Sequence, residues 1–258
     1  MMDCVPSCGK PESADSGGRE TTCDTLFGGR LVLRQDKTGY RFSIDSVLLA
    51  GLTRVKPADR VVDLGTGCGV VPLILAFRGR GREWIGVEIQ RELAELAREN
   101  VRRNGFGGRV AVVEADMRCL GDLVIPGSVD LVVSNPPYRR RGSGRVNSDR
   151  QRALARHEFA GSAADVFESA SGLLREGGRL ALIYPASRLE ELMGLGDRWG
   201  FRAKRLTMIH SDPGSPGCLV HLEYRKGGGP DLSVEPPFFI HDGRGGYSEA
   251  AKCLYEVP

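Results

Sequence analysis

The sequence predicts a doubly wound α/β fold with a mostly parallel sheet of seven strands. Two observations lead to this prediction. From Arg60 onward, short continuous apolar runs alternate with segments of helical periodicity, which is typical of parallel strands covered by helices on both faces. The first run ends in a glycine-rich turn that leads directly into an apolar helix. With 258 residues, the chain is long enough for one large domain of this class.

Ahead of the predicted core lie a polar tail and a short extension. Residues 1–24 are rich in Ser, Gly, Asp and Glu without periodicity, and we expect them to be disordered. The apolar runs 31–33 and 40–42 flank a turn-forming Lys-Thr-Gly at 37–39, which indicates a β-hairpin. Capping residues then introduce a short helix at 43–52.

The core elements follow in order along the chain. The expected strands are 61–64, 84–88, 110–113, 129–133, 180–184, 205–209 and 219–224. The expected helices run from the first glycine turn to Phe77, from 93 to 101, from 163 to 174 and from 189 to 195. In the second helix, Leu93, Ala97 and Val101 share one face, and Asn104-Gly105 provides a stop. A Pro/Gly-rich loop separates the last two strands, which indicates a closing antiparallel hairpin.

This order of elements predicts one domain and no internal repeat. We expect a tail at 1–24 and a single domain at 25–258. Within the domain, residues 25–57 would form the hairpin and helix, 58–226 the core, and 227–258 a C-terminal extension.

Composition and charge exclude several classes of protein. The chain has 36 Lys and Arg against 33 Asp and Glu, which gives a formal charge of +3. Its longest apolar run, Val70–Phe77, is far shorter than the roughly 20 residues that span a bilayer, and we expect no secretory leader. The seven cysteines form no C-x-x-C pair, so we expect no bound metal. Reduced thiols favour a cytoplasmic location.

The first candidate site is the loop at 63–69, between the first strand and its helix. Its glycines permit a tight turn and let a ligand approach the backbone, although a turn without a ligand would have the same composition. Two acids favour a ligand. Glu88 closes the second strand, where a carboxylate can accept hydrogen bonds from both hydroxyls of a ribose. Asp116 closes the third strand, where it can border an adenine.

Together with N-P-P-Y after the fourth strand, the D-x-G-x-G-x-G loop resembles the class I S-adenosylmethionine-dependent methyltransferases, which have a Rossmann-like fold. Dehydrogenases are less similar, because Val70 stands where their G-x-G-x-x-G fingerprint requires glycine. The loop also has no Lys or Arg for a phosphate. The resemblance implies a cofactor site formed by Asp63, Gly65, Thr66, Gly67, Cys68, Gly69, Glu88, Ile89, Asp116, Met117 and Asn135.

The second candidate site is Asn135-Pro136-Pro137-Tyr138, which by itself is a rigid turn at the end of a strand. An exocyclic amine on an aromatic ring is a poor nucleophile, because its lone pair is delocalised. The side-chain carbonyl of Asn135 and the backbone carbonyl of Pro136 could accept both N–H bonds and stabilise the charge that develops on the nitrogen. Tyr138 could stack on the base. In similar families, N-P-P-Y marks methylation of adenine N6, guanine N2 or glutamine amides.

The segment 42–50 is by itself a capped amphipathic helix. Placed before the glycine loop and N-P-P-Y, it closely resembles the bacterial tRNA1(Val) (adenine37-N6)-methyltransferases, and the similarity extends from about Leu26 to Pro237. This resemblance implies methylation of the N6 amine of an adenine in a tRNA anticodon loop. It also implies that Phe42, Ser43 and Asp45 lie over the methionine end of the cofactor.

Seven arginines and one acid between residues 139 and 156 give a local charge of +6 directly after N-P-P-Y. Charge runs are usually solvated surface. At this position, however, the phosphates of a bound RNA would lie beside the catalytic loop. We therefore expect RNA contacts from Arg139, Arg140, Arg141, Arg145, Arg150 and Arg152.

Three other functions stay open. Glutamine-N5 methyltransferases that act on proteins such as release factors also carry N-P-P-Y, but they usually have a helical domain ahead of the cofactor domain. Guanine-N2 methyltransferases of ribosomal RNA often carry a duplicated domain, for which 258 residues leave no room. A non-catalytic RNA-binding module that kept the fold would bind RNA but not the cofactor.

Overall fold

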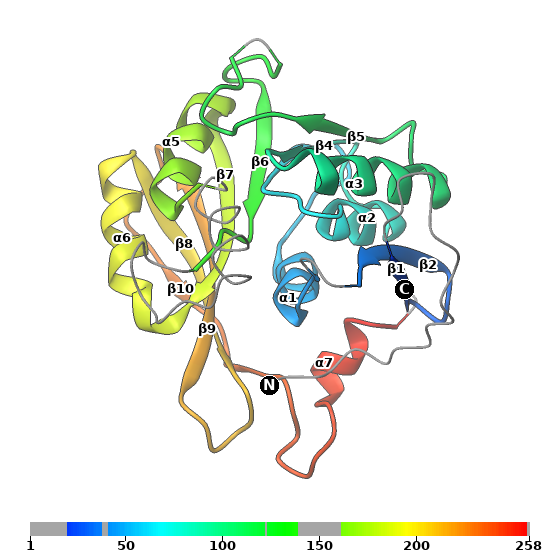
Figure 1. The fold of residues 1–258 in the computed structure, drawn as a ribbon. Helices are drawn as coiled ribbons and strands as arrows, with labels where there is room; N and C mark the ends of the chain where they lie inside the picture. Colours follow the sequence, from blue (N-terminus) through cyan, green and yellow to red (C-terminus); the bar gives the residue numbers. More distant parts are fainter. Residues whose placement is uncertain (1–19, 38–40, 122, 139–160, 257–258) are drawn as a thin grey trace, which may run out of the picture.

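The computed structural model describes residues 20–37, 41–121, 123–138 and 161–256. One twisted sheet crosses the middle of the molecule, with helices on both of its faces (Figure 1). Along the sheet the strands are ordered β5 (Val110–Glu114), β4 (Glu83–Glu88), β3 (Arg60–Leu64), β6 (Val129–Ser134), β7 (Leu174–Pro185), β9 (Gly217–Lys226) and β8 (Phe201–His210).

The pairing of these strands confirms the predicted doubly wound α/β fold. The strands from β5 to β7 are parallel, and β9 is antiparallel to both β7 and β8. The sequence did not predict two short strands, β10 (Ser233–Val234) and β11 (Phe238–Phe239), which pair with the edge strand β8. With two residues each, they are too short to show a hydrophobic period.

Two hydrophobic cores lie on opposite faces of the sheet. One core contains α1 (Ile44–Leu52), α2 (Val70–Phe77) and α3 (Arg91–Arg103), and the other contains α5 (Ala163–Leu173) and α6 (Leu189–Arg198). Neighbouring residues of a strand point to opposite faces, so Val61 belongs to the first core and Val62 to the second. Strand β3 sits where the chain order reverses, which is where open α/β sheets bind ligands.

The N-terminal hairpin differs from the prediction. Residues 31–33 belong to β2 (Leu31–Asp36), but its partner is β1 (Thr21–Leu26) and not 40–42. Strand β1 therefore begins inside the segment that we expected to be disordered, and residues 1–19 lie outside the described residues. The turn contains Phe27, Gly28 and Gly29 with φ of 54°, 63° and 86°. The two glycines take up left-handed backbone that favours glycine, a turn signal stronger than Lys-Thr-Gly.

Asparagine side chains fasten this hairpin to α3. The Oδ1 atom of Asn100 accepts a hydrogen bond from Arg34 N at 2.8 Å, and its Nδ2 donates to Arg34 O at 3.0 Å. Asn104, which was predicted as a helix stop and is the C-cap of α3, pairs with both backbone groups of Val32 at 2.9 and 2.7 Å. Two amides thus fill the open edge of β2 like a further strand.

The hairpin and β9 together hold α1 in place. Gln35 of β2 accepts a hydrogen bond from Phe42 N at 2.7 Å, just before Ser43, the N-cap of α1. At the other end of the helix, Thr53 Oγ1 lies 3.0 Å from His221 Nε2. The orientation of α1 is therefore set at its start by the nearby hairpin and at its end by a residue 168 positions away in the sequence.

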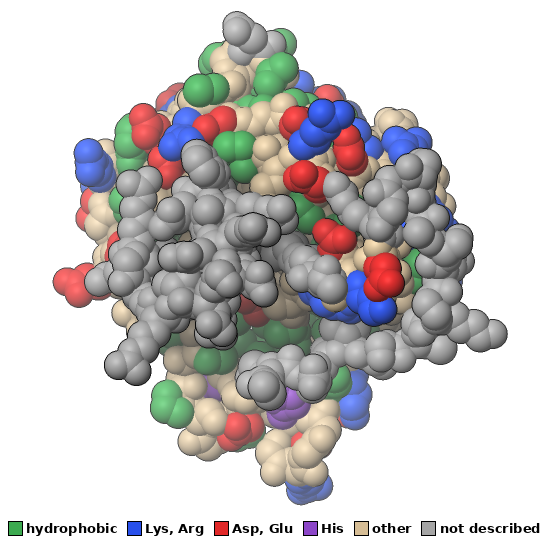
Figure 2. Space-filling view, viewed as in Figure 1, with side chains coloured by type: hydrophobic (Ala, Val, Ile, Leu, Met, Phe, Trp, Pro, Cys, Tyr) green, Lys and Arg blue, Asp and Glu red, His purple; other side chains and the backbone are tan. Residues whose placement is uncertain are grey.

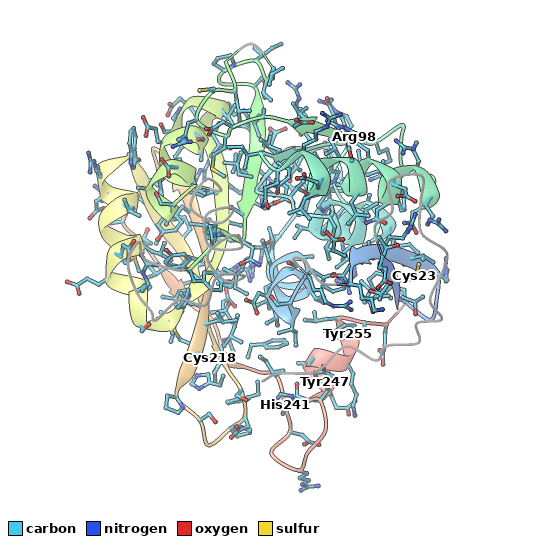
Figure 3. All side chains as sticks on the ribbon, in the orientation of Figure 1. Cys23, Arg98, Cys218, His241, Tyr247 and Tyr255 are labelled. Carbon is cyan, nitrogen blue, oxygen red and sulfur yellow. The ribbon has the colours of Figure 1, made fainter. Side chains whose placement is uncertain are left out.

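The C-terminal extension packs on the core next to this corner. His241 stacks on Tyr247 at a ring distance of 5.4 Å, and Tyr247 meets Tyr255 beyond the short helix α7 (Glu249–Cys253) (Figure 3). Arg78 at the end of α2 donates to Leu254 O at 2.7 Å. The described residues contain no helix long and apolar enough to cross a membrane, no disulfide and no cluster of metal-binding side chains.

Candidate active site

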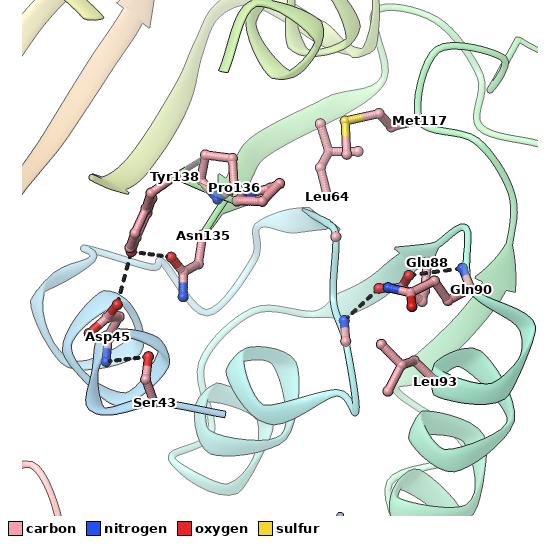
Figure 4. A pocket seen from close by; sticks show the side chains of 13 residues that line it. Ser43, Asp45, Leu64, Glu88, Gln90, Leu93, Met117, Asn135, Pro136 and Tyr138 are labelled. Carbon is pink, nitrogen blue, oxygen red and sulfur yellow. Dashed lines mark hydrogen bonds between the residues drawn. The ribbon is translucent and has the colours of Figure 1, made fainter. Parts of the chain in front are cut away.

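A pocket opens at the carboxyl ends of β3, β4 and β6, beside the N-terminus of α1 (Figure 4). It brings together most of the predicted site residues from five separate segments. Its lining comprises Ser43, Asp45, Leu64, Gly65, Gly67, Glu88, Gln90, Leu93, Met117, Asn135, Pro136, Pro137 and Tyr138. A smaller hollow adjoins it and adds Val87, Ile89, Ala115 and Asp116. Five predicted residues do not line either space: Phe42, Asp63, Thr66, Cys68 and Gly69.

The glycine loop needs its glycines for backbone geometry. Gly65, Gly67 and Gly69 have φ of 77°, 58° and 85°, in the left-handed region. Gly65 N and Thr66 N both donate to Val87 O, at 2.9 and 3.0 Å, which fixes the loop to the end of β4. A Cβ on Gly65 would meet nothing within 4 Å, so the backbone here borders open space.

The side chains of Asp63 and Thr66 do not line the pocket but stabilise the glycine loop by a hydrogen bond between them. Both are buried, and Thr66 Oγ1 donates to Asp63 Oδ2 at 2.7 Å. Burial raises the pKa of Asp63 to about 7, the charge of Glu88 adds to the rise, and the Thr66 hydrogen bond opposes it. A Cβ on Gly86 of β4 would lie 2.9 Å from Thr66 side-chain atoms, so position 86 has no room for a larger residue.

Glu88 presents a buried carboxylate to the pocket. It accepts hydrogen bonds from Gly67 N and Gln90 N, both at 2.9 Å, and is 4% exposed. Among the described residues it has no basic partner within ion-pair distance. Burial raises the pKa of Glu88, while the backbone N–H groups partly oppose that rise. Its remaining lone pairs suit neutral donors such as hydroxyl groups.

Asp116 and Met117 form the wall of the smaller hollow. Asp116 is held by its neighbour Arg118, whose Nη2 lies 2.5 Å from Asp116 Oδ2 and whose N donates to Oδ1 at 2.9 Å. The hydrogen bond from Arg118 lowers the pKa of Asp116. The Met117 carbonyl accepts a hydrogen bond from Ser169 Oγ of α5 at 2.9 Å.

The N-P-P-Y segment lies across the pocket from Glu88 (Figure 4). Ser134 Oγ donates to Leu64 O at 2.7 Å and so fixes the end of β6 to the start of the glycine loop. The side chain of Asn135 lies between two elements: its Nδ2 is 3.5 Å from Ser46 Oγ, and its Oδ1 is 2.5 Å from the Tyr138 hydroxyl. That hydroxyl also lies 3.0 Å from Asp45 Oδ2 of α1.

Sequence reasoning missed one residue that supports this segment. Arg188, at the end of the 3-10 turn η1 (Ala186–Arg188), donates to Tyr138 O at 2.8 Å. Its guanidinium lies 4.8 Å from the ring centre of Tyr184, which meets Tyr138 edge to face at 5.4 Å. Glu191 holds the same guanidinium through two hydrogen bonds of 2.7 and 2.6 Å. An isolated arginine 50 residues from its partner leaves no motif in a single sequence.

These features suit S-adenosylmethionine. The space beside Gly65 admits a ligand against the backbone, and the buried carboxylate of Glu88 suits ribose hydroxyls. Met117 offers an apolar wall in the adjoining hollow. The predicted RNA contacts, from Arg139 to Arg152, lie outside the described residues.

Comparison with known proteins agrees with this geometry. The family model described as methyltransferase small domain matches residues 41–193. A relative from Porphyromonas gingivalis is 34% identical over 83% of this chain and 87% of its own. One from Pedobacter heparinus is 30% identical over 85% of this chain and 92% of its own. Both are named tRNA1(Val) (adenine(37)-N6)-methyltransferase.

Solved structures support the fold. A predicted O-methyltransferase from Agrobacterium tumefaciens superposes with a TM-score of 0.67 at 25% identity, over 82% of this chain and 95% of that one. P. horikoshii TYW2 in complex with MeSAdo superposes with a TM-score of 0.55 at 20% identity, over 80% and 70% of the two chains. The predicted class I methyltransferase fold is thus confirmed. The chain belongs to the methyltransferase small-domain family, among the tRNA1(Val) (adenine(37)-N6)-methyltransferases.

Proposed function

We propose that this S-adenosylmethionine-dependent methyltransferase modifies the N6 amine of an adenine in tRNA, at position 37 of tRNA1(Val). One observation carries the proposal. The acceptor groups of Asn135 and Pro136 share a single pocket with the glycine loop and Glu88. A planar amine and a methyl donor would therefore meet in one pocket, as proximity catalysis requires.

The cofactor would occupy the side of the pocket formed by Gly65, Gly67 and Glu88, with Ile89 and Met117 at the adjoining hollow. When bound, S-adenosylmethionine supplies an electrophilic methyl group. Glu88 would accept hydrogen bonds from hydroxyl groups, since both of its oxygens are fixed by backbone N–H groups and its charge is not neutralised by a described cation. Ser43 and Asp45, at the start of α1, would lie over the methionine end of the cofactor.

The target amine would lie against Asn135 and Pro136. Asn135 Oδ1 and the carbonyl of Pro136 would accept its two N–H bonds and favour a pyramidal nitrogen with an available lone pair. Tyr138 lines the same wall and offers its ring to the base, a stacking contact worth roughly 1–3 kcal/mol. The nitrogen loses its proton to water after methylation, so no side chain is required as a strong base.

The target adenine must leave its base stack to enter this pocket, and the free-energy cost of unstacking is smallest for a base in a loop. Figure 2 shows acidic and basic side chains interspersed over the described part of one face of the molecule. Arginines of α3 are also paired with acids, as Arg91 is with Glu95 and Arg98 with Glu114. We therefore assign the contacts with RNA phosphates to the arginines between residues 139 and 152, which directly follow Tyr138. A tRNA substrate and reduced cysteines agree with action in the cytoplasm.

The test is transfer of a labelled methyl group to three pools: total tRNA, ribosomal RNA and a protein extract. We expect label as N6-methyladenosine in tRNA. Label as N2-methylguanosine in ribosomal RNA, or as methylglutamine in protein with RNA unlabelled, would overturn the proposal. Asn135→Ala serves as the matched variant, because it should retain affinity for S-adenosylhomocysteine and lose turnover. A wild-type chain that binds RNA but not S-adenosylhomocysteine would indicate a non-catalytic module instead.

A further inference from the structure

The hydroxyl of Tyr138 sits between two acceptors. It lies 2.5 Å from Asn135 Oδ1 and 3.0 Å from Asp45 Oδ2 (Figure 4). A phenol has one proton to donate. The 2.5 Å contact makes Asn135 Oδ1 the nearer acceptor of that proton, and the 3.0 Å contact places the same hydroxyl beside Asp45 of α1.

The carboxyl of Asp45 is held in place beside this hydroxyl. Burial raises the pKa of Asp45, and the hydrogen bonds from Tyr138 and Ser43 only partly oppose that rise. Its place is fixed, because Asp45 N donates to Ser43 Oγ at the N-cap of α1. The helix is held in turn by Gln35 and His221.

The Tyr138 hydroxyl decides which end of the Asn135 side-chain amide faces the target amine. A carboxamide rotated by 180° exchanges its acceptor and its donors with almost no change of shape. The long contact to Ser46 Oγ, at 3.5 Å, does not discriminate, since a hydroxyl both donates and accepts. The Tyr138 hydroxyl as a donor does discriminate. It occupies one lone pair of Oδ1 and leaves the second for the target amine.

We propose that Asp45 and Tyr138 act as positioning residues that hold the carbonyl end of Asn135 toward the target amine. This inference rests on the proposed function, since it assigns the orientation of the group that accepts the amine N–H. It gives Tyr138 a second role besides stacking, and it gives Asp45 a role separate from contact with the cofactor.

Tyr138→Phe tests the hydroxyl and keeps the ring. We expect kcat to fall about tenfold, with KM for tRNA and the Kd of S-adenosylhomocysteine changed by less than about twofold. Tyr224→Phe is the matched control, because the buried Tyr224 hydroxyl in β9 makes no hydrogen bond to a described residue. It should leave kcat unchanged. Full kcat in Tyr138→Phe, or a loss confined to KM, would overturn the inference.

Asp45 variants test whether the carboxyl helps to hold the Tyr138 hydroxyl. Asp45→Ala should lower kcat at saturating cofactor as far as Tyr138→Phe does. Asp45→Asn should retain most of kcat, because its side-chain amide still offers the Tyr138 hydroxyl a hydrogen-bond partner. The double variant of Tyr138→Phe and Asp45→Ala should be no slower than Tyr138→Phe alone, since both act through Asn135. Additive losses, or equal loss in Asp45→Asn and Asp45→Ala, would contradict the positioning role of Asp45.

A spectroscopic readout separates orientation from turnover. In a nitrogen-labelled sample, the side-chain amide resonances of Asn135 are identified by their loss in Asn135→Ala. They should shift in Tyr138→Phe and Asp45→Ala but not in Tyr224→Phe. Unshifted resonances would overturn the inference. If the wild type methylates adenine while these variants behave as wild type, only this inference fails; if the wild type labels no RNA, the proposed function fails.

Discussion

Two buried glutamates of similar exposure occupy opposite electrostatic settings. Glu88 beside the glycine loop is 4% exposed and Glu223 in β9 is 7% exposed. Burial alone would raise the pKa of both. In Glu223, however, hydrogen bonds from Arg205 and from Arg54 N hold the pKa below its usual value, whereas the pKa of Glu88 stays raised. A buried carboxylate neutralised by a cation thus marks a structural anchor at the end of α1, which consists of the Glu223–Arg205 ion pair and the contact between Thr53 and His221. A buried carboxylate without a described cation marks the ligand site.

The largest expected effect is on stability, at the paired glutamate. Glu223 binds Arg205 at 2.5 Å and accepts from Arg54 N at 2.9 Å. Glu223→Gln leaves the guanidinium of Arg205, whose side chain is 11% exposed, without its counter-ion, so we expect about 3–5 kcal/mol of lost stability in denaturant unfolding. The folded fraction should bind S-adenosylhomocysteine as the wild type does. An unchanged unfolding midpoint would show that the pair is not the anchor that we infer.

A somewhat smaller effect should appear as acid sensitivity of the same anchor. Burial lowers the pKa of His221 to about 4 from 6.5. The unfolded chain therefore takes up this proton first, and stability that is complete above pH 6.5 is lost as the pH falls toward 4. The shift corresponds to about 3 kcal/mol. Unfolding at several pH values should show this slope in the wild type.

The control for acid sensitivity is His221→Gln, which keeps a polar partner for Thr53 and should remove most of the slope. The comparison of the two proteins is needed because Asp63 and Glu88 act in the opposite direction. Burial raises their pKa values, so the folded state binds protons more tightly and stability falls as pH rises through their range. Equal slopes in the wild type and His221→Gln would refute the assignment to His221.

At the unpaired glutamate we expect an effect on binding. Glu88→Gln keeps the size of the side chain but replaces one acceptor oxygen with a donor group and removes the charge. The affinity for S-adenosylhomocysteine should fall about tenfold to a hundredfold, since hydrogen bonds to charged groups contribute about 1.5–3 kcal/mol. The unfolding free energy should not fall as it does in Glu223→Gln. Titration calorimetry measures the affinity, and loss of stability with intact affinity would reverse the comparison.

The sequence predicted the ligand site, because its motifs are short and local in the chain. Strand alternation indicated the sheet, and the order of motifs placed Gly65, Glu88 and Asn135 at one edge. The anchor could not be predicted, because Thr53 and His221 are 168 residues apart and meet only through packing. The same holds for Asp45 and Tyr138, which are 93 residues apart. The hairpin was assigned to the wrong partner strand because two turn signals, at 28–29 and 37–39, flank the same apolar run.

The smallest expected effect concerns Asp116, which combines the two settings. It borders the smaller hollow, as a ligand-binding acid would, yet Arg118 already pairs with it. The side chains of Asp116 and Arg118 are 27% and 45% exposed, so solvent screens the pair and keeps its contribution small. Asp116→Asn should therefore weaken S-adenosylhomocysteine binding by at most about fivefold, measured in the same titration as Glu88→Gln. A loss as large as that of Glu88→Gln would show that a paired and exposed acid can serve the cofactor equally well, and that the presence of a cation does not separate structural carboxylates from binding ones.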